Sequence, residues 1–378
     1  MNSSKIYFPN LNGLRFIAAF LVIIHHIEQF KLVLKLENYF YTIPFILVIG
    51  KLGVVLFFVL SGFLITYLLL AEESAFKKIS IGKFYIRRIL RIWPLYFLIL
   101  FLAFVVLPNI GLFTFPGMGK DFVYSDLWLK ILLYAFFFPN LVVAMLGIVP
   151  YASHTWSIGT EEQFYLVWPV ILTYIRRFRI WLMASIVVFY LFFEKILASQ
   201  YGDFIPSKGT IAAFWSTFNI DCMAIGGIFA ILLFQQSKLL KLFLNKYIFY
   251  IALITVSSLM IKGIIIPYVH NELYAVLFGL IILNFAANNQ IGISLENKVL
   301  NYLGNISYGL YMYHSIGIIL AISIAKSAGI TTNWLIYPLS FILTILIAGL
   351  SYRYYESYFL QFKHRFSKII SGNDSVKH

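Results

Sequence analysis

Two ionisable residues, Arg15 and His26, lie in the first apolar run of the chain. They are eleven positions apart, about 1,100° of helical rotation, so on one helix they would share a face to within about 20°, separated by about 16 Å. An imidazole can act as a general base or nucleophile, and a guanidinium binds phosphate or carboxylate. Because each group is costly inside a bilayer unless it is paired or faces a cavity, we expect both to line a pore or cleft. The alternative is that Arg15 extends to the interface while His26 and His25, which lie on different faces, bond to adjacent helices.

A second cluster is the sequence RRILRIWPLY, which contains Arg87, Arg88, Arg91 and Tyr96. Arg88 and Arg91 are three positions apart and are therefore adjacent on a helix. Two guanidiniums with an aromatic neighbour suit an adenine nucleotide, through bidentate hydrogen bonds to phosphate and stacking on the base. The alternative is a cytoplasmic anchor of the kind that most basic clusters provide.

The most polar stretch beside an apolar run is HTWSIGTEEQFYLVWP, which contains Trp156, Ser157 and Glu161. Ser157 or Thr160 could cap a helix here, with Glu161 in its first turn near the positive end of the helix dipole. Alternatively, Glu161 projects into the cavity of His26, where it could orient the imidazole or a hydroxyl substrate.

Three further candidates, Ser61, Asp221 and His314, lie in apolar segments. Ser61 begins SGFLIT, whose small residues would let another helix or a slender acyl chain approach closely. His314 would lie about 18 Å into its helix, a depth comparable with that of His26. For Asp221 and His314 the alternative is an ordinary buried hydrogen bond.

The chain around these residues is too apolar for a soluble protein. Of its 378 residues, 61% are hydrophobic and 12% are charged, about half the charge of a soluble domain. Its 29 Lys and Arg against 15 Asp and Glu give a net charge of +14, which is typical of cytoplasmic loops in a membrane protein and argues against nucleic-acid binding. Cys222 is the one cysteine, so a disulfide framework and a cysteine-based metal site are excluded, and we predict no bound metal.

The apolar runs are about 16 to 25 residues long, which predicts helices rather than the short alternating strands of a membrane barrel. The predicted fold is an all-α, polytopic membrane helix bundle with about ten crossings and both termini in the cytoplasm. The predicted crossings are approximately 13–32, 43–71, 92–108, 162–176, 180–198, 211–235, 247–266, 272–288, 302–325 and 334–352. The basic clusters that set this orientation are Lys77–Arg91, Arg176–Arg179, Lys238–Lys246 and Lys363–Lys368.

The apolar stretch 127–149 does not fit this orientation as a crossing, because it would place two of the basic clusters outside. It is interrupted by Pro139 and Gly147, so we predict a re-entrant or interfacial segment. We expect no signal peptide, since the first apolar run lacks a small-residue cleavage site. Residues 1–360 are predicted to form one membrane domain, and 361–378 a basic cytoplasmic tail with a disordered end from Ser371.

The motifs also resemble a known family. In order, they are GLR, then ten residues and His26, and after these FFVLSGFLIT, RRILRIWPLY, HTWSIGTEEQFYLVWP and LGNISYGLYMYH. Together, from Gly13 to about Glu356, they resemble the acyltransferase-3 family of bacterial membrane acyltransferases, which acylate sugars of surface polysaccharides. The resemblance implies that Arg15 and His26 are the functionally required pair. It also implies a multi-pass protein of the bacterial cytoplasmic membrane.

The same resemblance assigns the other motifs. Arg88 and Arg91 correspond to the family's arginines that are implicated in the use of acyl-coenzyme A. Glu161 corresponds to the glutamate of the family's WSLSVEEQFY motif. This chain reads WSIGTEEQFY, a mild departure. Some members have an additional hydrolase-like domain; we expect this chain to be a stand-alone transferase because it ends before such a domain.

From these assignments we expect acyl transfer from a thioester to a sugar hydroxyl. His26 would be the general base, oriented by Glu161 or His314, or it would carry the acyl group as an acyl-histidine. Arg15 belongs to the catalytic set and would help to hold the coenzyme's phosphates. The predicted donor site comprises Arg88, Arg91, Arg87, Tyr96 and Ser61, and the predicted acceptor site comprises Trp156, Ser157, His314 and Asp221.

The expected partners are the bilayer, acyl-coenzyme A as a co-substrate, with acetyl the commonest acyl group in the family, and a glycan or lipid-linked oligosaccharide acceptor. No permanently bound cofactor is predicted. The alternative from another class is a transporter or flippase for a lipid-linked sugar or anionic metabolite, with Arg15, His26, Asp221 and His314 lining its pathway.

Overall fold

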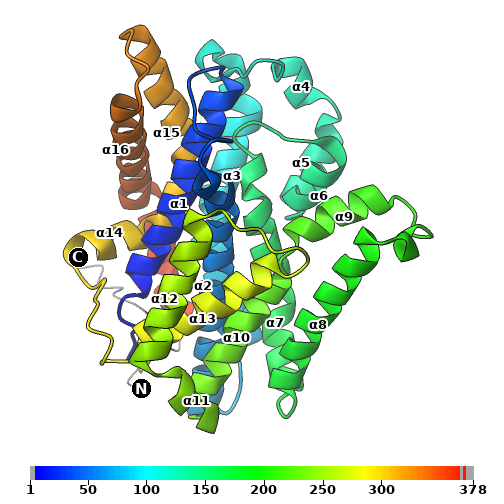
Figure 1. Ribbon diagram of the computed structural model, residues 1–378, viewed down its shortest axis with the longest axis vertical. Coiled ribbons are helices and arrows are strands. Elements are labelled where there is room, and N and C mark those ends of the chain that lie inside the picture. The colour runs from blue at the N-terminus through cyan, green and yellow to red at the C-terminus, as the bar shows by residue number, and fades with distance from the viewer. Residues whose placement is uncertain (1–4, 367–368, 372–378) are drawn as a thin grey trace.

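The computed structural model describes residues 5–366 and 369–371, and in this part of the chain almost every element is a helix (Figure 1). The named strands, β1 (Lys5–Ile6) and β2 (Ile370–Ser371), are two residues each and pair in parallel. They bring the two ends of the described chain together. The predicted all-α fold is confirmed.

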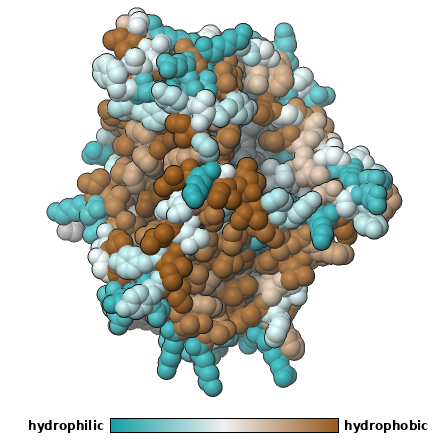
Figure 2. Space-filling view, in the orientation of Figure 1, coloured by the Kyte–Doolittle hydropathy of each residue, from teal (hydrophilic) through white to brown (hydrophobic). Residues whose placement is uncertain are grey.

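Eight helical segments of the described chain are long and apolar enough to cross a membrane. Five are single helices: α1 (Leu11–Val33), α2 (Pro44–Phe76), α8 (Arg179–Ala198), α13 (His270–Ala287) and α15 (Ser307–Ser327). Three are composite: α3 (Ile81–Phe101) with the π turn η1 (Leu102–Val106) and η2 (Leu107–Asn109); α9 (Lys208–Thr217) with α10 (Ile220–Phe234); and α16 (Asn333–Ser351) with the π turn η6 (Tyr352–Glu356) and α17 (Ser357–Lys363). Figure 2 shows the resulting apolar surface between two polar ends. The predicted polytopic membrane bundle is therefore confirmed.

Two of the ten predicted crossings do not belong to this set. The first half of α7 (Trp156–Tyr174) is the polar sequence WSIGTEEQ, which lowers its overall hydropathy. The apolar helix α12 (Lys246–Ile261) has 16 residues, or about 24 Å against a hydrocarbon core of about 30 Å. Both predicted segments are helical, but the count of spans by length and composition is eight rather than ten.

The stretch 127–149 forms two short helices, α5 (Leu127–Ala135) and α6 (Pro139–Leu146), of 9 and 8 residues. They are broken at Phe137, whose φ is 61°, and α6 ends at Gly147, whose φ of 84° favours glycine. Neither helix is long enough to cross a bilayer. This agrees with the predicted re-entrant or interfacial segment. The remaining helical elements are η3 (Gly111–Phe113), α4 (Lys120–Tyr124), η4 (Ser153–Thr155), η5 (Gln200–Gly202), α11 (Lys238–Phe243), α14 (Lys298–Asn305) and η7 (His364–Phe366).

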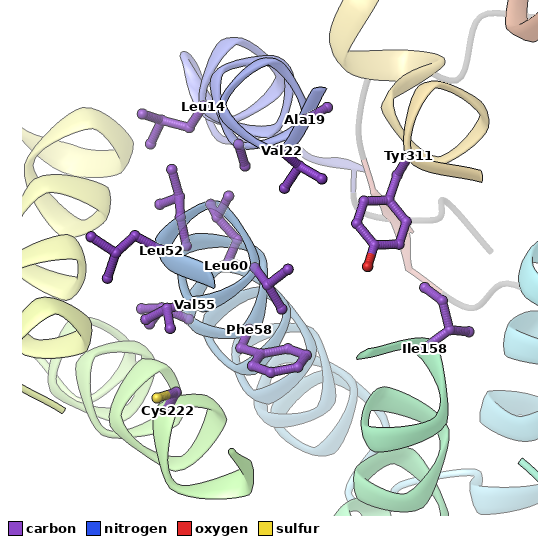
Figure 3. Close-up of a cluster of buried hydrophobic side chains, with 14 of the residues drawn as sticks. Leu14, Ala19, Val22, Leu52, Val55, Phe58, Leu60, Ile158, Cys222 and Tyr311 are labelled. Atoms are coloured by element: carbon purple, nitrogen blue, oxygen red, sulfur yellow. The ribbon is translucent and has the colours of Figure 1, made fainter. Parts of the chain in front are cut away.

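The centre of the bundle is α2, which packs against α1 on one side and α10 on another (Figure 3). The helices α2 and α10 meet through glycines. A Cβ at Gly62 would lie 2.0 Å from the carbonyl oxygen of Met223, and one at Gly226 would lie 2.2 Å from that of Val59. The small-residue motif that begins at Ser61 therefore serves helix packing through Gly62.

Basic residues from distant parts of the sequence meet at one end of α2. Glu73 forms ion pairs with Arg176 at 2.8 Å and Arg179 at 2.7 Å, and Glu72 pairs with Arg87 at 3.2 Å. The helix α11 and the start of the described chain lie at this same lower end in Figure 1. The predicted tail is described only in part: α17 packs beside α3, and the predicted disordered end lies outside the described residues except for Ser371.

Candidate active site

A large cavity opens near the N-terminal segment and extends into the bundle between α1, α2, α3, α7 and α15. We call it the arginine chamber and define it by Arg15, Ser61, Arg88, Arg91, Tyr165 and Tyr308, which line both of its connected parts. Its outer part encloses about 1260 Å³, with the mouth included, and its deeper part about 700 Å³. Such a volume accommodates a ligand larger than a typical metabolite.

The three guanidiniums of the arginine chamber form no ion pair with a described carboxylate. Arg15 donates one hydrogen bond, from Nη1 to Asn12 Oδ1 at 3.3 Å. The guanidinium of Arg88 lies over the rings of Phe84 and Tyr165, at 5.5 and 5.6 Å, while its buried Nε has no hydrogen-bond partner among the described residues. Glu161 and Glu356 line the same cavity but form no direct ion pair with these cations, so the guanidinium N–H groups can bind a polyanionic group such as phosphate.

Glu161 lies at the wall of the arginine chamber, where it accepts hydrogen bonds from Ser61 Oγ at 2.8 Å and the Tyr165 hydroxyl at 3.0 Å. The two expectations for this residue were wrong. It is not in the first turn of its helix, because α7 already begins at Trp156 and has no side-chain cap. It also does not share the cavity of His26, because Glu161 lines the arginine chamber and His26 lines a separate cavity.

Two members of the predicted donor site lie outside the arginine chamber. Arg87 pairs with Glu72 and donates to the Phe366 carbonyl at 3.0 Å. It is one position before Arg88, and 100° of helical rotation turns it to another face. Tyr96 is buried, stacks on Phe137 and donates to the Tyr134 carbonyl at 2.8 Å. These contacts hold α3 in place, and neither residue lines the arginine chamber, so their assignment to the donor site stays a prediction.

A second cavity, of about 880 Å³, lies farther along α1. We call it the histidine chamber and define it by His26, Phe115, Tyr151, His154, Trp156 and Ser315, which line it. Its remaining walls are largely apolar side chains of α1 and of the segment 143–150. Among the described residues, no arginine or lysine lines it, in contrast with the first chamber.

Three imidazoles are grouped beside this chamber. The ring of His314 is 4.7 Å from that of His26 and 4.9 Å from that of His154, between centroids. His26 Nδ1 bonds to the Val22 carbonyl at 2.9 Å. A carbonyl only accepts, so Nδ1 carries the proton and Nε2 keeps its lone pair. Nε2 of His26 is therefore available as a base or a nucleophile.

The other two imidazoles differ in their partners. His314 Nδ1 donates to the Tyr311 carbonyl at 2.5 Å, and its Nε2 faces Ser315 Oγ at 3.4 Å. His154 lies just before α7, and its buried Nε2 has no hydrogen-bond partner among the described residues. Burial, and then the nearby His26, lowers the pKa of His154 to about 3, so that it is neutral at pH 7. No arrangement of His, Cys, Asp and Glu in the described chain could hold a metal ion.

Tyr311 joins the walls of the two chambers, and Figure 3 shows its hydroxyl pointing toward the start of α7 near Ile158. The Tyr311 hydroxyl donates to the His154 carbonyl at 2.6 Å and accepts from Ser157 Oγ at 2.7 Å. Tyr311 and Ser157 line the arginine chamber, whereas His154 lines the histidine chamber. Arg15 and His26 thus belong to one helix but to different cavities. The predicted acceptor residues Ser157 and Trp156 are divided in the same way.

Asp221 does not reach either chamber. It is fully buried at the start of α10, where Cys222 Sγ lies 3.8 Å from its Oδ2 and its Oδ1 has no hydrogen-bond partner among the described residues. Its charged neighbours include Glu272 and Lys51. The prediction that Asp221 lines the substrate site is corrected, because α10 turns it toward α13 instead.

Several residues of the site were missed from the sequence. Tyr165 could have been found because it lies four positions after Glu161 and so on the same helix face. Lys51 is a lysine within an otherwise apolar span, which is a signal of function in itself. His154 and Tyr311 had no comparable signal, because their importance depends on how α15 packs against α7.

Comparison with known proteins places the chain among membrane acyltransferases. It is 28% identical over 378 residues to O-acetyltransferase OatA of Staphylococcus aureus, covering 94% of this chain and 57% of that protein. It is 28% identical over 377 residues to YrhL of Bacillus subtilis, covering 93% and 54%, and 30% identical over 177 residues to peptidoglycan O-acetyltransferase OatA of Listeria monocytogenes, covering 45% and 25%. The chain thus spans little more than half the length of the first two relatives. No solved structure matches it.

The decisive comparison is with the family defined by the acyltransferase domain. Residues 8–353 match that family, so the match includes both chambers and Tyr311 between them. It covers each of the motifs from Arg15 to His314 on which the resemblance was based. The chain belongs to the acyltransferase-3 family.

Proposed function

We propose that the protein is a membrane O-acyltransferase that moves an acyl group, most simply acetyl, from acyl-coenzyme A to a hydroxyl of a cell-surface glycan. The family and the names of its O-acetyltransferase relatives support the reaction class. The peptidoglycan named for the Listeria relative supports a polysaccharide acceptor. The observation that carries the proposal is the pair of chambers, one lined by arginines without an ion-pair partner among the described residues and one by histidines, whose walls are joined through Tyr311.

The arginine chamber is the proposed site of the acyl donor. Coenzyme A carries several phosphate charges on a long flexible arm, and Arg15, Arg88 and Arg91 offer guanidiniums that form no direct ion pair with a described carboxylate. Tyr308 and Tyr165 add aromatic surface to the same walls. The deeper part of the chamber ends at Tyr311, so the thioester end of the arm would lie close to this residue.

The histidine chamber is the proposed site of the acceptor. As a base, His26 Nε2 would take the proton of the acceptor hydroxyl while the hydroxyl oxygen attacks the thioester carbonyl. The carbon–sulfur bond then breaks and the thiolate takes up the proton. As a relay, Nε2 would itself attack the thioester carbonyl, and the carbon–sulfur bond would break with release of the thiolate. The acceptor oxygen would then attack the acyl carbon, the bond to imidazole would break, and the hydroxyl proton would pass to the thiolate. The free lone pair at Nε2 supports either route.

We place the protein in the bacterial cytoplasmic membrane, with both termini and the mouth of the arginine chamber in the cytoplasm. The basic residues gathered around Glu72 and Glu73 at one end of α2 support this orientation by the positive-inside rule. Acyl-coenzyme A is a cytoplasmic metabolite, which is consistent with that side. The acceptor would then enter from the opposite side.

The test compares the surface glycan of a strain lacking the gene with that of its parent by mass spectrometry. Loss of an O-linked ester with unchanged glycan length and amount supports the transferase, and the mass difference names the acyl group. Loss of the glycan itself would instead support the transporter. A plasmid-borne wild-type copy should restore the ester, whereas a His26→Ala copy should not.

A further inference from the structure

Lys51 is an ionisable residue in a membrane-spanning helix, seven residues after the start of α2. Its ammonium group forms no ion pair with a described carboxylate. It donates one hydrogen bond, to the Ser216 carbonyl at 2.7 Å. A lysine in a bilayer costs several kcal/mol unless it is compensated, so packing alone does not explain this residue.

The ammonium group also lies over the aromatic ring of Trp156. Lys51 Nζ lies 4.7 Å from the centre of the Trp156 ring, a cation–π distance. The edge of Phe58 approaches the same ring at 6.1 Å and 80° between planes. Two groups on α2 therefore fix the position of the first side chain of α7.

Carboxyl groups surround the lysine at longer range. Asp221 and Glu272 lie near enough to interact electrostatically with Lys51. Each has a buried oxygen without a hydrogen-bond partner among the described residues, Asp221 Oδ1 and Glu272 Oε1. Two carboxyl groups buried beside each other do not both ionise, so together they supply at most one negative charge near Lys51.

Trp156 itself is a wall of the histidine chamber. The chamber also presents Tyr151 and Phe115, and it offers Gln29 and Ser153 as polar groups beside His26. Flat aromatic surfaces with a few polar groups suit a pyranose ring, whose C–H face packs on the aromatic ring while its hydroxyls form hydrogen bonds.

We propose that Trp156 is the stacking platform for a pyranose ring of the acceptor and that Lys51 is its positioning residue. This inference rests on the proposed transferase function and narrows it to a ring-shaped carbohydrate acceptor. Lys51 does not touch the substrate. It holds the Trp156 ring at the angle that the pyranose requires.

The proposal separates binding from stability. Replacing Lys51 by Met removes a charge from the membrane interior while keeping the length of the side chain, so the protein should not unfold at a lower temperature. The acceptor should nevertheless bind more weakly, because the Trp156 ring loses its anchor. Lys51→Arg keeps a cation over the ring and should restore most of the binding.

The experiment uses the purified full chain in lipid nanodiscs, radiolabelled acetyl-coenzyme A, and the de-esterified surface glycan of the deletion strain as the acceptor. We expect Lys51→Met to raise the KM for the glycan about fivefold to tenfold, with the KM for acetyl-coenzyme A within about twofold of wild type. Trp156→Leu should raise the glycan KM at least as much. Lys195→Met, on the exposed last turn of α8, is the matched control and should change neither constant.

An unchanged glycan KM in Lys51→Met, or equal increases in both KM values, would overturn the proposal. So would failure of Lys51→Arg to restore binding in a protein that melts like wild type. If wild-type protein forms no ester on the glycan, the proposed transferase function fails instead. The wild-type measurement alone distinguishes that failure from a failure of the proposal about Trp156 and Lys51.

Discussion

The arginine chamber and the histidine chamber share one wall but contain opposite kinds of polar group. The first holds three guanidiniums with no described ion-pair partner, whereas the second is largely apolar and holds imidazoles whose proton positions are set by backbone carbonyls. The first can attract and hold a charged ligand. The second can accept a proton or form a bond.

This difference indicates that donor binding and the acyl-transfer chemistry belong to different cavities, both of which are lined in part by α1. Arg15 and His26 are both on α1, and Tyr311 and Ser157 close the space between their chambers. Changes in one chamber should therefore alter a different kinetic constant from changes in the other. The predictions below test that separation.

The largest effect is expected at His26. Replacing it by Ala removes the available Nε2 from the histidine chamber, so kcat should fall by at least about 10²-fold to 10⁴-fold while the KM for acetyl-coenzyme A stays close to wild type. Steady-state kinetics in nanodiscs measure both constants. His25→Ala is the matched control, because His25 bonds to the Ile46 carbonyl and lines neither chamber. Substantial turnover by His26→Ala would remove this residue from the chemistry.

The next largest effect is expected in the arginine chamber, with the opposite kinetic signature. Arg88→Ala should raise the KM for acetyl-coenzyme A by about tenfold or more, because a buried charge-assisted hydrogen bond to phosphate is lost. Lys at this position should recover part of the affinity, since it keeps the charge but not the planar geometry. A fall in kcat alone, with no change in KM, would contradict the assignment.

Arg87 provides the control for this experiment. It is adjacent to Arg88 in sequence but pairs with Glu72 outside the chamber. Arg87→Ala should lower the melting temperature slightly and leave the KM for acetyl-coenzyme A unchanged. The two neighbouring arginines thus separate donor binding from helix anchoring.

A smaller effect is expected at the wall itself. Tyr311→Phe removes the hydroxyl that joins the His154 carbonyl to Ser157, so the wall should become more permeable to water. We expect the rate of acetyl-coenzyme A hydrolysis, relative to transfer, to rise a few-fold. Tyr313→Phe loses a hydrogen bond to Ser351 instead and should leave that ratio unchanged. Equal ratios in the two variants would mean that Tyr311 does not keep the chambers apart.

Helical periodicity predicted part of this arrangement. It correctly placed Arg88 and Arg91 together, since residues three apart share a helix face. Arg87 was assigned to the same donor site, although adjacent residues do not share a face, and the structure turns it away from the chamber. The stretch 127–149 was also correctly expected to be interrupted near its proline and glycine. Both predictions depend on local sequence, which is where such reasoning is strongest.

The division into two chambers could not be predicted in this way. It depends on Tyr311 of α15 reaching Ser157 of α7, a contact between residues 154 positions apart. Glu161 was expected either in the first turn of its helix or beside His26. The helix begins at Trp156 instead, and Ser61 and Tyr165 hold the carboxylate at the arginine chamber. Asp221 was misplaced for a related reason, because burial alone does not show which neighbouring helix a side chain faces.

The smallest effect is expected at the mouth of the arginine chamber, where the N-terminal segment is held by Glu296. Its carboxylate accepts hydrogen bonds from the Tyr7 hydroxyl, the Asn10 backbone N–H at 2.7 Å and Asn301 Nδ2 at 2.6 Å. Burial tends to raise the pKa of Glu296, but these hydrogen bonds outweigh it and lower the pKa. The group therefore stabilises the fold above its unfolded pKa, and this contribution is lost as the pH falls through the lower, folded value.

Glu296→Gln should consequently lower the melting temperature at pH 7 by about 1 °C, since the site is exposed, and the difference from wild type should shrink below pH 4 or so. Melting curves of both proteins in nanodiscs between pH 3.5 and 7 measure this difference in melting temperature. Because Tyr7 and Asn12 line the mouth of the arginine chamber but not the histidine chamber, a loosened N-terminal segment should weaken donor binding and leave acceptor binding intact. A change in the acceptor KM with the donor KM unaltered would mean that the two chambers are not independent sites.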